Sequence, residues 1–222
     1  MTEYSTTRAR VEDYFDRSAT KVWERLCSDA PVSRIRQTVR MGRDAMRAMM
    51  LGQLPADLTG ARVLDAGCGT GLMTAELARC GAEVVAVDIS PQLIAIAKDR
   101  LEPRFAPQVT FAAGDMTDEA LGRFDHVIAM DSLIYYSGSD ISAILHRLES
   151  RTRGSVVFTV APRTPFLMAF FTAGKLFPRA DRSPTMIPHA FEALVKSAGP
   201  GLGRVGRVSR GFYISECLEY RS

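Results

Sequence analysis

The sequence has few of the residues from which metal sites and disulfide frameworks are built. Its four cysteines are scattered without a CxxC pair, and its three histidines are isolated. We therefore expect no protein metal site, and free thiols in a reducing cytosol. Long apolar runs are also missing. None reaches about 18 residues, and the first ten residues are polar, so neither a membrane-spanning helix nor a signal peptide is expected, and the predicted location is cytoplasmic.

The totals are those of a globular domain with a large core: 222 residues, 46% of them hydrophobic and 24% charged. The net charge is +3 over residues 1–50, −7 over residues 51–150 and +7 over residues 151–222. The basic tail is compatible with nucleic acid, an anionic membrane surface, an acidic small molecule, or no partner at all. It lacks the interleaved aromatic residues of a stacking platform, which disfavours nucleic acid.

Two helical patterns form a lead-in at the start of the chain. Apolar residues recur at helical spacing over residues 11–26 and again over residues 33–51, and the turn-rich stretch 52–60 follows. Because both patterns precede the strands described next, we interpret residues 1–56 as a helical cover outside the core. Residues 57–222 then form the main domain.

After the lead-in, short apolar strands alternate with helical stretches. This alternation predicts an α/β fold of the doubly wound, Rossmann-like type, with a mostly parallel sheet covered on both faces. The final segment, residues 203–222, predicts a hairpin that closes the sheet at its edge. The expected strands are 62–66, 83–88, 109–114, 124–130 and 155–161, and the expected helices between them lie near 72–80, 91–101 and 140–150.

The stretch "DAGCGTG", residues 65–71, places three glycines at alternate positions after the first strand. A dinucleotide-binding loop would need its third glycine at position 72, but this position is leucine and the glycine comes one residue earlier. The pattern resembles the first motif of class I methyltransferases that use S-adenosylmethionine (SAM). That resemblance implies a loop whose bare backbone holds the methionine part of SAM.

Three further strand ends agree with this motif. Asp88 ends the second strand, where an acid can accept hydrogen bonds from both ribose hydroxyls. Gly114-Asp115-Met116 ends the third strand, where relatives of this class hold the adenine ring, and Met130-Asp131-Ser132 follows the fourth, next to the methionine end. The expected SAM-binding residues are Asp65, Gly67, Gly69, Gly71, Asp88, Ile89, Asp115, Met116 and Met130.

Longer segments carry a more specific resemblance. "DYFDRSATKVWERL" (13–26), "MDSLIYY" (130–136) and "APRTPFLMAFFTAGKLFPRADRSPTMIP" (161–188) closely resemble the magnesium-protoporphyrin IX O-methyltransferase family, and the likeness runs from about Val11 to the end. The resemblance implies methyl transfer from SAM to one propionate of a magnesium porphyrin in (bacterio)chlorophyll synthesis, with magnesium present only in the substrate. It also implies the large porphyrin-binding subunit of magnesium chelatase as a partner.

The residues after the fifth strand suit such a substrate, which has a large apolar face and two carboxylates. Residues 163–187 combine aromatic and aliphatic side chains with cations, and we interpret them as a lid in which arginine orients a propionate. The alternative interpretation is a core helix followed by an ordinary basic loop. The expected substrate-binding residues are Tyr136, Arg163, Phe166, Phe170, Arg179 and Arg182.

Little acid–base chemistry is expected. A propionate, with a reference pKa of about 4.3, is deprotonated at neutral pH, so the protein needs only to align it and remove water. Tyr14 and Tyr135 are the candidate catalytic residues, as hydrogen-bond donors, and their alternative role is packing. Other branches of the family have histidine where this sequence has Tyr135, so a mechanism that needs an imidazole there does not carry over. His126, within a strand, is interpreted as structural.

Two other functions stay open at this point. One is a SAM-dependent O-methyltransferase for another lipophilic acid or a phenol, and the other is a SAM- or porphyrin-binding module without catalysis. Residues 165–177 are too few for a spanning helix, which needs about 20, and Lys175 interrupts them. Their apolar face and the neighbouring arginines predict weak peripheral contact with the photosynthetic membrane.

Overall fold

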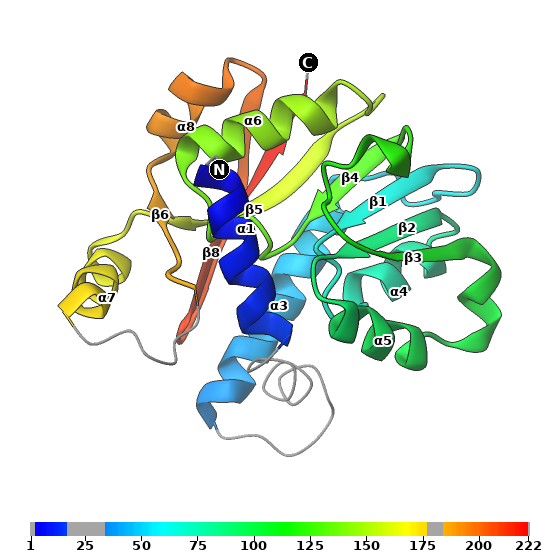
Figure 1. Ribbon diagram of the computed structural model, residues 1–222, viewed down its shortest axis with the longest axis horizontal. Helices are drawn as coiled ribbons and strands as arrows, with labels where there is room; N and C mark the ends of the chain where they lie inside the picture. Colours follow the sequence, from blue (N-terminus) through cyan, green and yellow to red (C-terminus); the bar gives the residue numbers. More distant parts are fainter. Residues whose placement is uncertain (1–2, 17–33, 177–183, 222) are drawn as a thin grey trace.

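A mixed eight-stranded sheet forms the centre of the computed structural model, which describes residues 3–16, 34–176 and 184–221 (Figure 1). Its strands are β1 (Arg62–Ala66), β2 (Glu83–Asp88), β3 (Val109–Ala113), β4 (His126–Ala129), β5 (Val156–Pro162), β6 (Pro188–His189), β7 (Leu202–Arg210) and β8 (Tyr213–Tyr220). Their order is β3-β2-β1-β4-β5-β8-β7, and the short β6 pairs with β5.

The strands β1 to β5 run parallel, while β8 and β7 form an antiparallel hairpin against β5. β1 pairs with β2 on one side and with β4 on the other, so the strand order reverses at β1. Doubly wound sheets bind ligands outside the carboxyl ends of their strands at such a switch point. The topology therefore predicts a binding site at the ends of β1 and β4.

Helices cover both faces of this sheet. They are α1 (Glu3–Tyr14), α3 (Arg34–Leu51), α4 (Leu72–Arg79), α5 (Pro91–Arg100), α6 (Gly138–Glu149), α7 (Pro165–Leu176) and α8 (Phe191–Ala198). Two 3-10 turns, Pro103–Gln108 and Glu119–Leu121, precede and follow β3. Figure 1 shows α6 and α8 next to each other; they pack on one face, and α3, α4 and α5 pack on the other.

Alternate residues of each strand face these two helix layers. In β2, Val85 and Val87 belong to the cluster with α6, whereas Val84 and Ala86 belong to the cluster with α3 and α4. All four side chains are buried. A strand buried on both faces is a continuous apolar run rather than an alternating one, which is why "EVVAVD" predicts a central strand.

Local signals determine where the helices begin. Ser90 caps α5, because its side-chain oxygen accepts a hydrogen bond from the backbone nitrogen of Leu93 (3.3 Å), and Pro91 occupies the first turn. α4 begins instead after Gly71, which is left-handed (φ 81°) and offers no side-chain cap. A Cβ at Gly71 would lie 3.1 Å from the Cβ of Ala97, so this glycine lets α4 start close to α5.

The structure confirms the predicted doubly wound α/β fold. The five predicted parallel strands and the three helices between them are present, with ends that differ from the expected ones by at most two residues. The predicted hairpin is β7–β8, with β7 at the sheet edge. Helix α8 is absent from the prediction, because at eight residues its apolar period is too short to stand out.

The first helix begins earlier than expected. The prediction of a helix over residues 11–26 is wrong at its start, because α1 begins at Glu3; residues 17–26 lie outside the described part of the chain. Residues 3–10 are mostly polar and lack the apolar period of a helix that faces a core. This part of α1 contacts polar side chains instead, through Tyr4 and Arg8.

Helix α3 has the expected extent but belongs to the core. The interpretation of the lead-in as lying outside the core is wrong for α3, because Met46 and Met50 are fully buried in the cluster that includes β1, β2 and β8. α3 packs on β7 and β8, where a Cβ at Gly42 would come within 2.7 Å of the Tyr213 ring. An antiparallel hairpin brings no crossover helix of its own, so α3 covers this end of the sheet. The domain division at residue 56 stays a prediction.

Candidate active site

A cavity opens at the carboxyl ends of the parallel strands, with about 980 Å³ of empty space that includes the solvent at its mouth. We call the residues at the ends of β1 to β4 the strand-end wall: Asp65, Gly67, Cys68, Gly69, Thr70, Val87, Asp88, Ile89, Gly114, Asp115, Met116, Met130, Asp131 and Ser132. We call the residues from α1, from Phe15 directly after it and from α3 the helical wall: Tyr4, Arg8, Val11, Phe15, Arg43 and Arg47.

The loop after β1 presents bare backbone to the cavity. Gly67 and Gly69 are both left-handed, with φ of 83° and 54°. A Cβ at Gly67 would lie 2.4 Å from the Cβ of Ser132, so no side chain fits there, whereas a Cβ at Gly69 or Gly114 would meet no atom within 4 Å. Open space above bare backbone gives a ligand room for close approach. Of the predicted SAM-binding residues, Gly71 alone lies outside the cavity lining.

Asp88, at the end of β2, holds this loop in place. Its Oδ2 accepts a hydrogen bond from the backbone nitrogen of Gly69 (2.8 Å), and its Oδ1 accepts one from that of Ser90 (3.0 Å). Burial raises the pKa of Asp88 to about 6. A carboxylate oxygen accepts more than one hydrogen bond, so both oxygens keep capacity for the two hydroxyls of a diol.

Asp65, at the end of β1, is a second buried acid in the strand-end wall. Its Oδ2 accepts a hydrogen bond from the hydroxyl of Thr74 (2.6 Å). Burial raises the pKa of Asp65 to about 7, while the Thr74 hydrogen bond and the positive charge of Arg47 act in the opposite direction. A cation that enters the cavity beside Asp65 therefore favours its charged form, so this position suits an ammonium group.

Asp115, after β3, joins α1 to the strand-end wall. Its Oδ1 accepts hydrogen bonds from the Tyr4 hydroxyl and from the backbone and side chain of Thr117 (2.8 Å each), and its Oδ2 pairs with Nη1 of Arg8 (3.0 Å). Burial acts to raise the pKa of Asp115, but the hydrogen bonds from Thr117 and Tyr4 outweigh it and lower the pKa. One acceptor position, on Oδ2, is left for a further donor.

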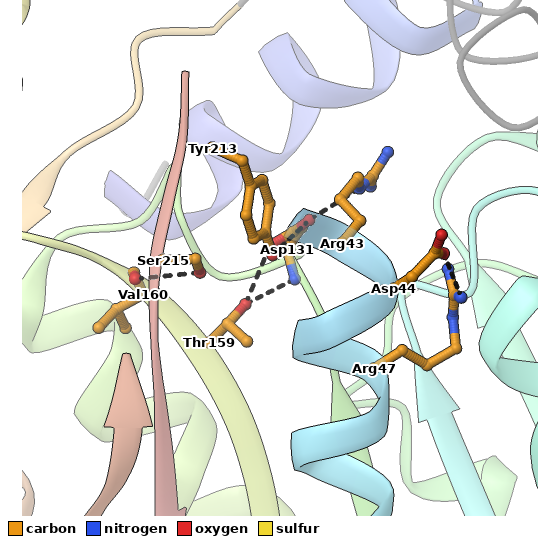
Figure 2. A network of polar contacts seen from close by, with 8 residues as sticks. All are labelled: Arg43, Asp44, Arg47, Asp131, Thr159, Val160, Tyr213 and Ser215. Carbon is orange, nitrogen blue, oxygen red and sulfur yellow. Dashed lines mark hydrogen bonds and ion pairs between the residues drawn. The ribbon is translucent and has the colours of Figure 1, made fainter. Parts of the chain in front are cut away.

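Asp131, after β4, joins α3 to the C-terminal hairpin (Figure 2). Its carboxylate accepts hydrogen bonds from Nε of Arg43 (3.1 Å) and from the hydroxyl of Tyr213 (3.1 Å), and its backbone nitrogen donates to Oγ1 of Thr159 (2.7 Å). Asp131 has φ of 55°, a left-handed value that aspartate tolerates better than most residues. Residues of α3, β5 and β8 thus hold the turn at Asp131, whose neighbours Met130 and Ser132 line the cavity.

Tyrosines line the cavity beyond this turn. Tyr135 and Tyr136 both face it, and Tyr4 stacks on Tyr136 with ring centroids 5.3 Å apart. Tyr14 is not among the lining residues; its ring contacts Phe15 edge-on at 5.2 Å, and Phe15 contacts Tyr135 edge-on at 6.1 Å. Burial is the largest cause that raises the pKa values of Tyr135 and Tyr136. Their hydroxyls are therefore protonated at neutral pH and can donate hydrogen bonds but not act as bases.

The predicted substrate-binding residues are spread over several places. Tyr136 lines the cavity, while Arg163 and Phe166 are exposed, just after β5 and in the first turn of α7, outside the cavity lining. Phe170 lies in α7. Arg179 and Arg182 lie outside the described residues. The lid over residues 163–187 stays a prediction.

The helical wall contains four polar residues that the sequence motifs do not reveal. They are Tyr4, Arg8, Arg43 and Arg47. Each helix supplies two of them four residues apart, a spacing that places both on one helical face. No local pattern marks these arginines, because Arg43 pairs with Asp131, far away in the sequence, and Arg47 pairs with Asp44 on the same helix.

A doubly wound sheet with this glycine loop, a buried acid after β2 and a cavity above both defines a class I SAM-dependent methyltransferase. Residues 63–153 match the family model of a methyltransferase domain, and residues 129–222 match that of the magnesium-protoporphyrin IX methyltransferase C-terminus. The chain is 64% identical to the magnesium-protoporphyrin O-methyltransferase of Rhodobacter capsulatus, over 99% of its own length and 98% of that protein. It belongs to the magnesium-protoporphyrin O-methyltransferase family.

A relative and a solved structure from Synechocystis agree with this membership. The chain is 31% identical to the magnesium-protoporphyrin O-methyltransferase of Synechocystis, over 94% of each protein. The crystal structure of the magnesium protoporphyrin IX methyltransferase from Synechocystis PCC 6803 with bound SAH superimposes with a TM-score of 0.79 at 29% identity. The match covers 97% of this chain and 100% of that one.

Proposed function

We propose that this protein transfers the methyl group of SAM to a propionate carboxylate of magnesium protoporphyrin IX, giving the monomethyl ester in (bacterio)chlorophyll synthesis. The observation that carries the proposal is the cavity, in which bare backbone at Gly67 and Gly69 lies beside the buried Asp88 in a chain of this family. SAM supplies a methyl group on a positively charged sulfur atom when bound. The chain's residues bind, align and desolvate the reactants.

In this proposal the adenine, ribose and methionine parts of SAM lie at the ends of successive neighbouring strands of the sheet. Asp88, at the end of β2, accepts hydrogen bonds from both ribose hydroxyls, with Ile89 beside it. Met116 and the remaining acceptor position of Asp115, at the end of β3, contact the adenine ring and its amino group. Asp65, at the end of β1, holds the ammonium of the methionine part. Support for this arrangement is the presence of these residues in the cavity lining in the order β3-β2-β1.

Methyl transfer to a propionate needs alignment rather than a base. A carboxylate oxygen forms a bond to the methyl carbon, the carbon–sulfur bond breaks, and its electron pair stays on sulfur, so no proton moves. With a pKa of about 4.3, the propionate is already ionised. Tyr14 and Tyr135 act as donors that orient it, in agreement with the burial that keeps the Tyr135 hydroxyl protonated. Exclusion of water strengthens a weak, well-solvated nucleophile.

The porphyrin lies on the side of the cavity that faces the predicted lid. Its apolar face contacts Tyr136 and the α7 residues Phe166 and Phe170. Its carboxylates pair with arginines of residues 151–222, a region with a net charge of +7. The proposed arginines are Arg163, Arg179 and Arg182.

The decisive experiment is an assay of methyl-ester formation from SAM and magnesium protoporphyrin IX, run beside a panel of phenols and other lipophilic acids. We expect turnover of the porphyrin and none of the panel. Turnover of a panel compound instead would point to a different O-methyltransferase. Binding of SAM and porphyrin without any ester would support a non-catalytic binding module.

Weak peripheral contact with an anionic membrane is part of the proposal. Among the described residues, no helix has the length and apolarity needed to cross a bilayer. Large apolar side chains are nevertheless exposed on α7 and near the hairpin tip, where Phe166 is 46% and Phe212 is 55% exposed. Flotation with anionic liposomes that high salt reverses is the expected result, and binding that resists salt would contradict it.

The large porphyrin-binding subunit of magnesium chelatase is a second proposed partner. A flat, poorly soluble porphyrin is transferred most safely within a complex, and the family resemblance implies this donor. Co-elution of the two proteins, and faster ester formation from porphyrin supplied on the subunit than from free porphyrin, are expected. Equal rates without co-elution would contradict the partnership.

A further inference from the structure

A buried arginine holds the loop that follows β3, which we call the β3 loop (residues 114–118). Arg151 lies two residues after the end of α6 and is only 8% exposed. Its Nη2 donates a hydrogen bond to the backbone oxygen of Met116 (2.6 Å), and its Nη1 donates one to that of Asp118. Arg151 is not among the residues that line the cavity; it lines a separate pocket together with Thr117. It therefore reaches the β3 loop from outside the cavity.

These contacts account for a cation that is buried without an ion pair. Among the residues that the structure describes, no carboxylate pairs with Arg151. A charged group removed from water needs hydrogen bonds in place of its hydration, and the fork of donors on a guanidinium fits two backbone oxygens at once. Arg147, one turn earlier on α6, adds a longer hydrogen bond to the backbone oxygen of Thr117 (3.4 Å). Three consecutive carbonyl groups of the β3 loop thus point toward the end of α6.

The backbone of Arg151 gives these contacts a rigid base. Its nitrogen donates to the backbone oxygen of Leu148 in α6 (3.2 Å), and its oxygen accepts from the backbone nitrogen of Phe124, just before β4 (2.9 Å). The guanidinium also lies over the ring of Phe124, 5.6 Å from its centroid, and Phe124 is buried in the core. The position of the β3 loop is therefore coupled to the core of the sheet through one side chain.

Thr117 connects the held backbone to the carboxylate of Asp115. The backbone nitrogen and the hydroxyl of Thr117 both donate to Oδ1 of Asp115 (2.8 Å each), and Thr117 is buried. Tyr4 and Arg8 orient the same carboxylate through its oxygens, whereas Arg151 acts on the backbone that carries it. A hydrogen bond weakens steeply when its angle changes, so the direction in which Oδ2 can accept depends on the β3 loop.

We propose that Arg151 is a positioning residue for adenine recognition. It fixes the β3 loop so that Asp115 distinguishes an amino group from an oxygen atom at this position of the ligand. The inference rests on the proposed SAM-binding function, in which Oδ2 of Asp115 accepts a hydrogen bond from the adenine amino group. Arg151 touches no ligand atom itself, and Arg147 assists it through Thr117.

The test compares two ligands that differ at this amino group: SAH and S-inosylhomocysteine, which has an oxygen atom in its place. Beside a carboxylate, this oxygen replaces a hydrogen bond by repulsion. Calorimetric titration of the wild-type protein should therefore give SAH an advantage of about ten- to a hundredfold in affinity. In Arg151→Met this advantage should fall to about threefold or less, because the carboxylate of Asp115 is no longer held in one direction. Arg151→Lys keeps the charge without the planar fork and should show an intermediate advantage.

Arg62→Met is the matched control. The Arg62 guanidinium lies over the same Phe124 ring, 4.9 Å from its centroid. Its Nη1 donates to the backbone oxygens of Leu121 (3.1 Å) and Arg123 (2.8 Å), which belong to the same connection between β3 and β4 but follow the β3 loop. The substitution removes the same kinds of contact from the same connection. It should lower stability in urea unfolding and leave the advantage for SAH unchanged.

Several outcomes would overturn the positioning role. They are an Arg151→Met protein that keeps the wild-type advantage, an equal loss of affinity for both ligands, and an Arg62→Met protein that loses the advantage to the same degree. If Arg151→Met does not fold, Arg151→Lys decides, and an undiminished advantage there would overturn the role as well. Wild-type protein that binds both ligands equally would remove adenine from Asp115 and the proposal with it. Wild-type protein that binds neither ligand would refute the proposed SAM-binding function itself.

Discussion

The strand-end wall of the cavity comes from loops that each follow a strand directly, whereas the helical wall comes from two helices that precede the whole sheet. The positions of Asp65, Asp88 and Asp115 are determined by the strands that end beside them. The positions of Arg8 and Arg43 depend on ion pairs with residues far away in the sequence. Cofactor affinity and the attachment of the helices should therefore be separable by mutation.

Met46→Ala should have the largest effect on stability. Met46 is fully buried between α3 and the sheet, so its truncation should lower the free energy of unfolding by about 2–5 kcal/mol. Met41→Ala, on the same helix but 48% exposed, is the control and should change it by about 0.5 kcal/mol or less. Urea unfolding measures both. Equal stability of the two variants would show that α3 is a detachable cover after all.

Asp88→Ala should have the largest effect on cofactor affinity. The loss of two charge-assisted hydrogen bonds to ribose, together about 2–4 kcal/mol, should weaken SAH binding by about thirtyfold or more. Asp99→Ala, which removes an exposed carboxylate from α5, is the control. Calorimetric titration measures both dissociation constants. An unchanged value for Asp88→Ala would remove Asp88 from the proposed site.

Gly67→Ala tests how closely the strand-end wall is packed. Gly67 and Gly60 have almost the same left-handed φ (83° and 80°), so alanine is strained equally at both. A Cβ at Gly67 would overlap Ser132, whereas one at Gly60 meets nothing within 4 Å. Gly67→Ala should therefore cost about 1–3 kcal/mol more stability than Gly60→Ala, by denaturant unfolding, and also weaken SAH binding. Equal costs would mean that the loop moves freely away from Ser132.

The pH dependence of SAH binding should test the two buried acids of the strand-end wall. Burial raises the pKa of Asp65 to about 7 and that of Asp88 to about 6, and both bind the ligand best as anions. SAH affinity should therefore rise by about tenfold or more between about pH 5 and pH 7.5. Asp88→Asn should flatten the lower part of this profile. A constant wild-type affinity over the range would contradict ionisation of these acids on binding.

The free protein should show the opposite trend in stability. The folded pKa values of Asp65 and Asp88 lie above the value of about 3.9 expected in the unfolded chain, so the folded state binds more protons between these values. The contribution of these two acids to the free energy of unfolding should thus decrease as the pH rises from about 4 to about 7. Thermal unfolding with and without SAH over this range measures both trends.

The strand-end wall could be predicted from the sequence because each of its residues lies within a few positions of a strand end. Once "VLDAG" and "VVAVD" are read as buried parallel strands, Gly67 and Asp88 must come to the same edge of the sheet. Eight of the nine predicted SAM-binding residues accordingly line the cavity. Gly71 lies outside the lining because its role is to bring α4 close to α5.

The helical wall could not be predicted, because its contacts are between segments far apart in the sequence. Arg43 contacts Asp131 only because α3 packs on the hairpin that also presents Tyr213, and no local pattern specifies that packing. The early start of α1 could not be predicted for a related reason. Its polar residues face Asp115, so the helix has no apolar period there. Hydrophobic periodicity detects helices that face a core but misses helices that face a polar cavity.

The place of β8 inside the sheet affects how the protein is made. β8 is the last strand described, yet it lies between β5 and β7 in the sheet. Val156 of β5 pairs with Tyr220 of β8, although α7 and α8 separate the two strands in the sequence. During synthesis on the ribosome, β5 therefore keeps an open edge, with unpaired backbone groups that attract other chains, until the hairpin has emerged. Tyr213 arrives in the same step, so the turn at Asp131 acquires its last hydrogen bond only then. We expect a nascent chain to gain tight SAM binding late and abruptly, and to depend on chaperones until that moment.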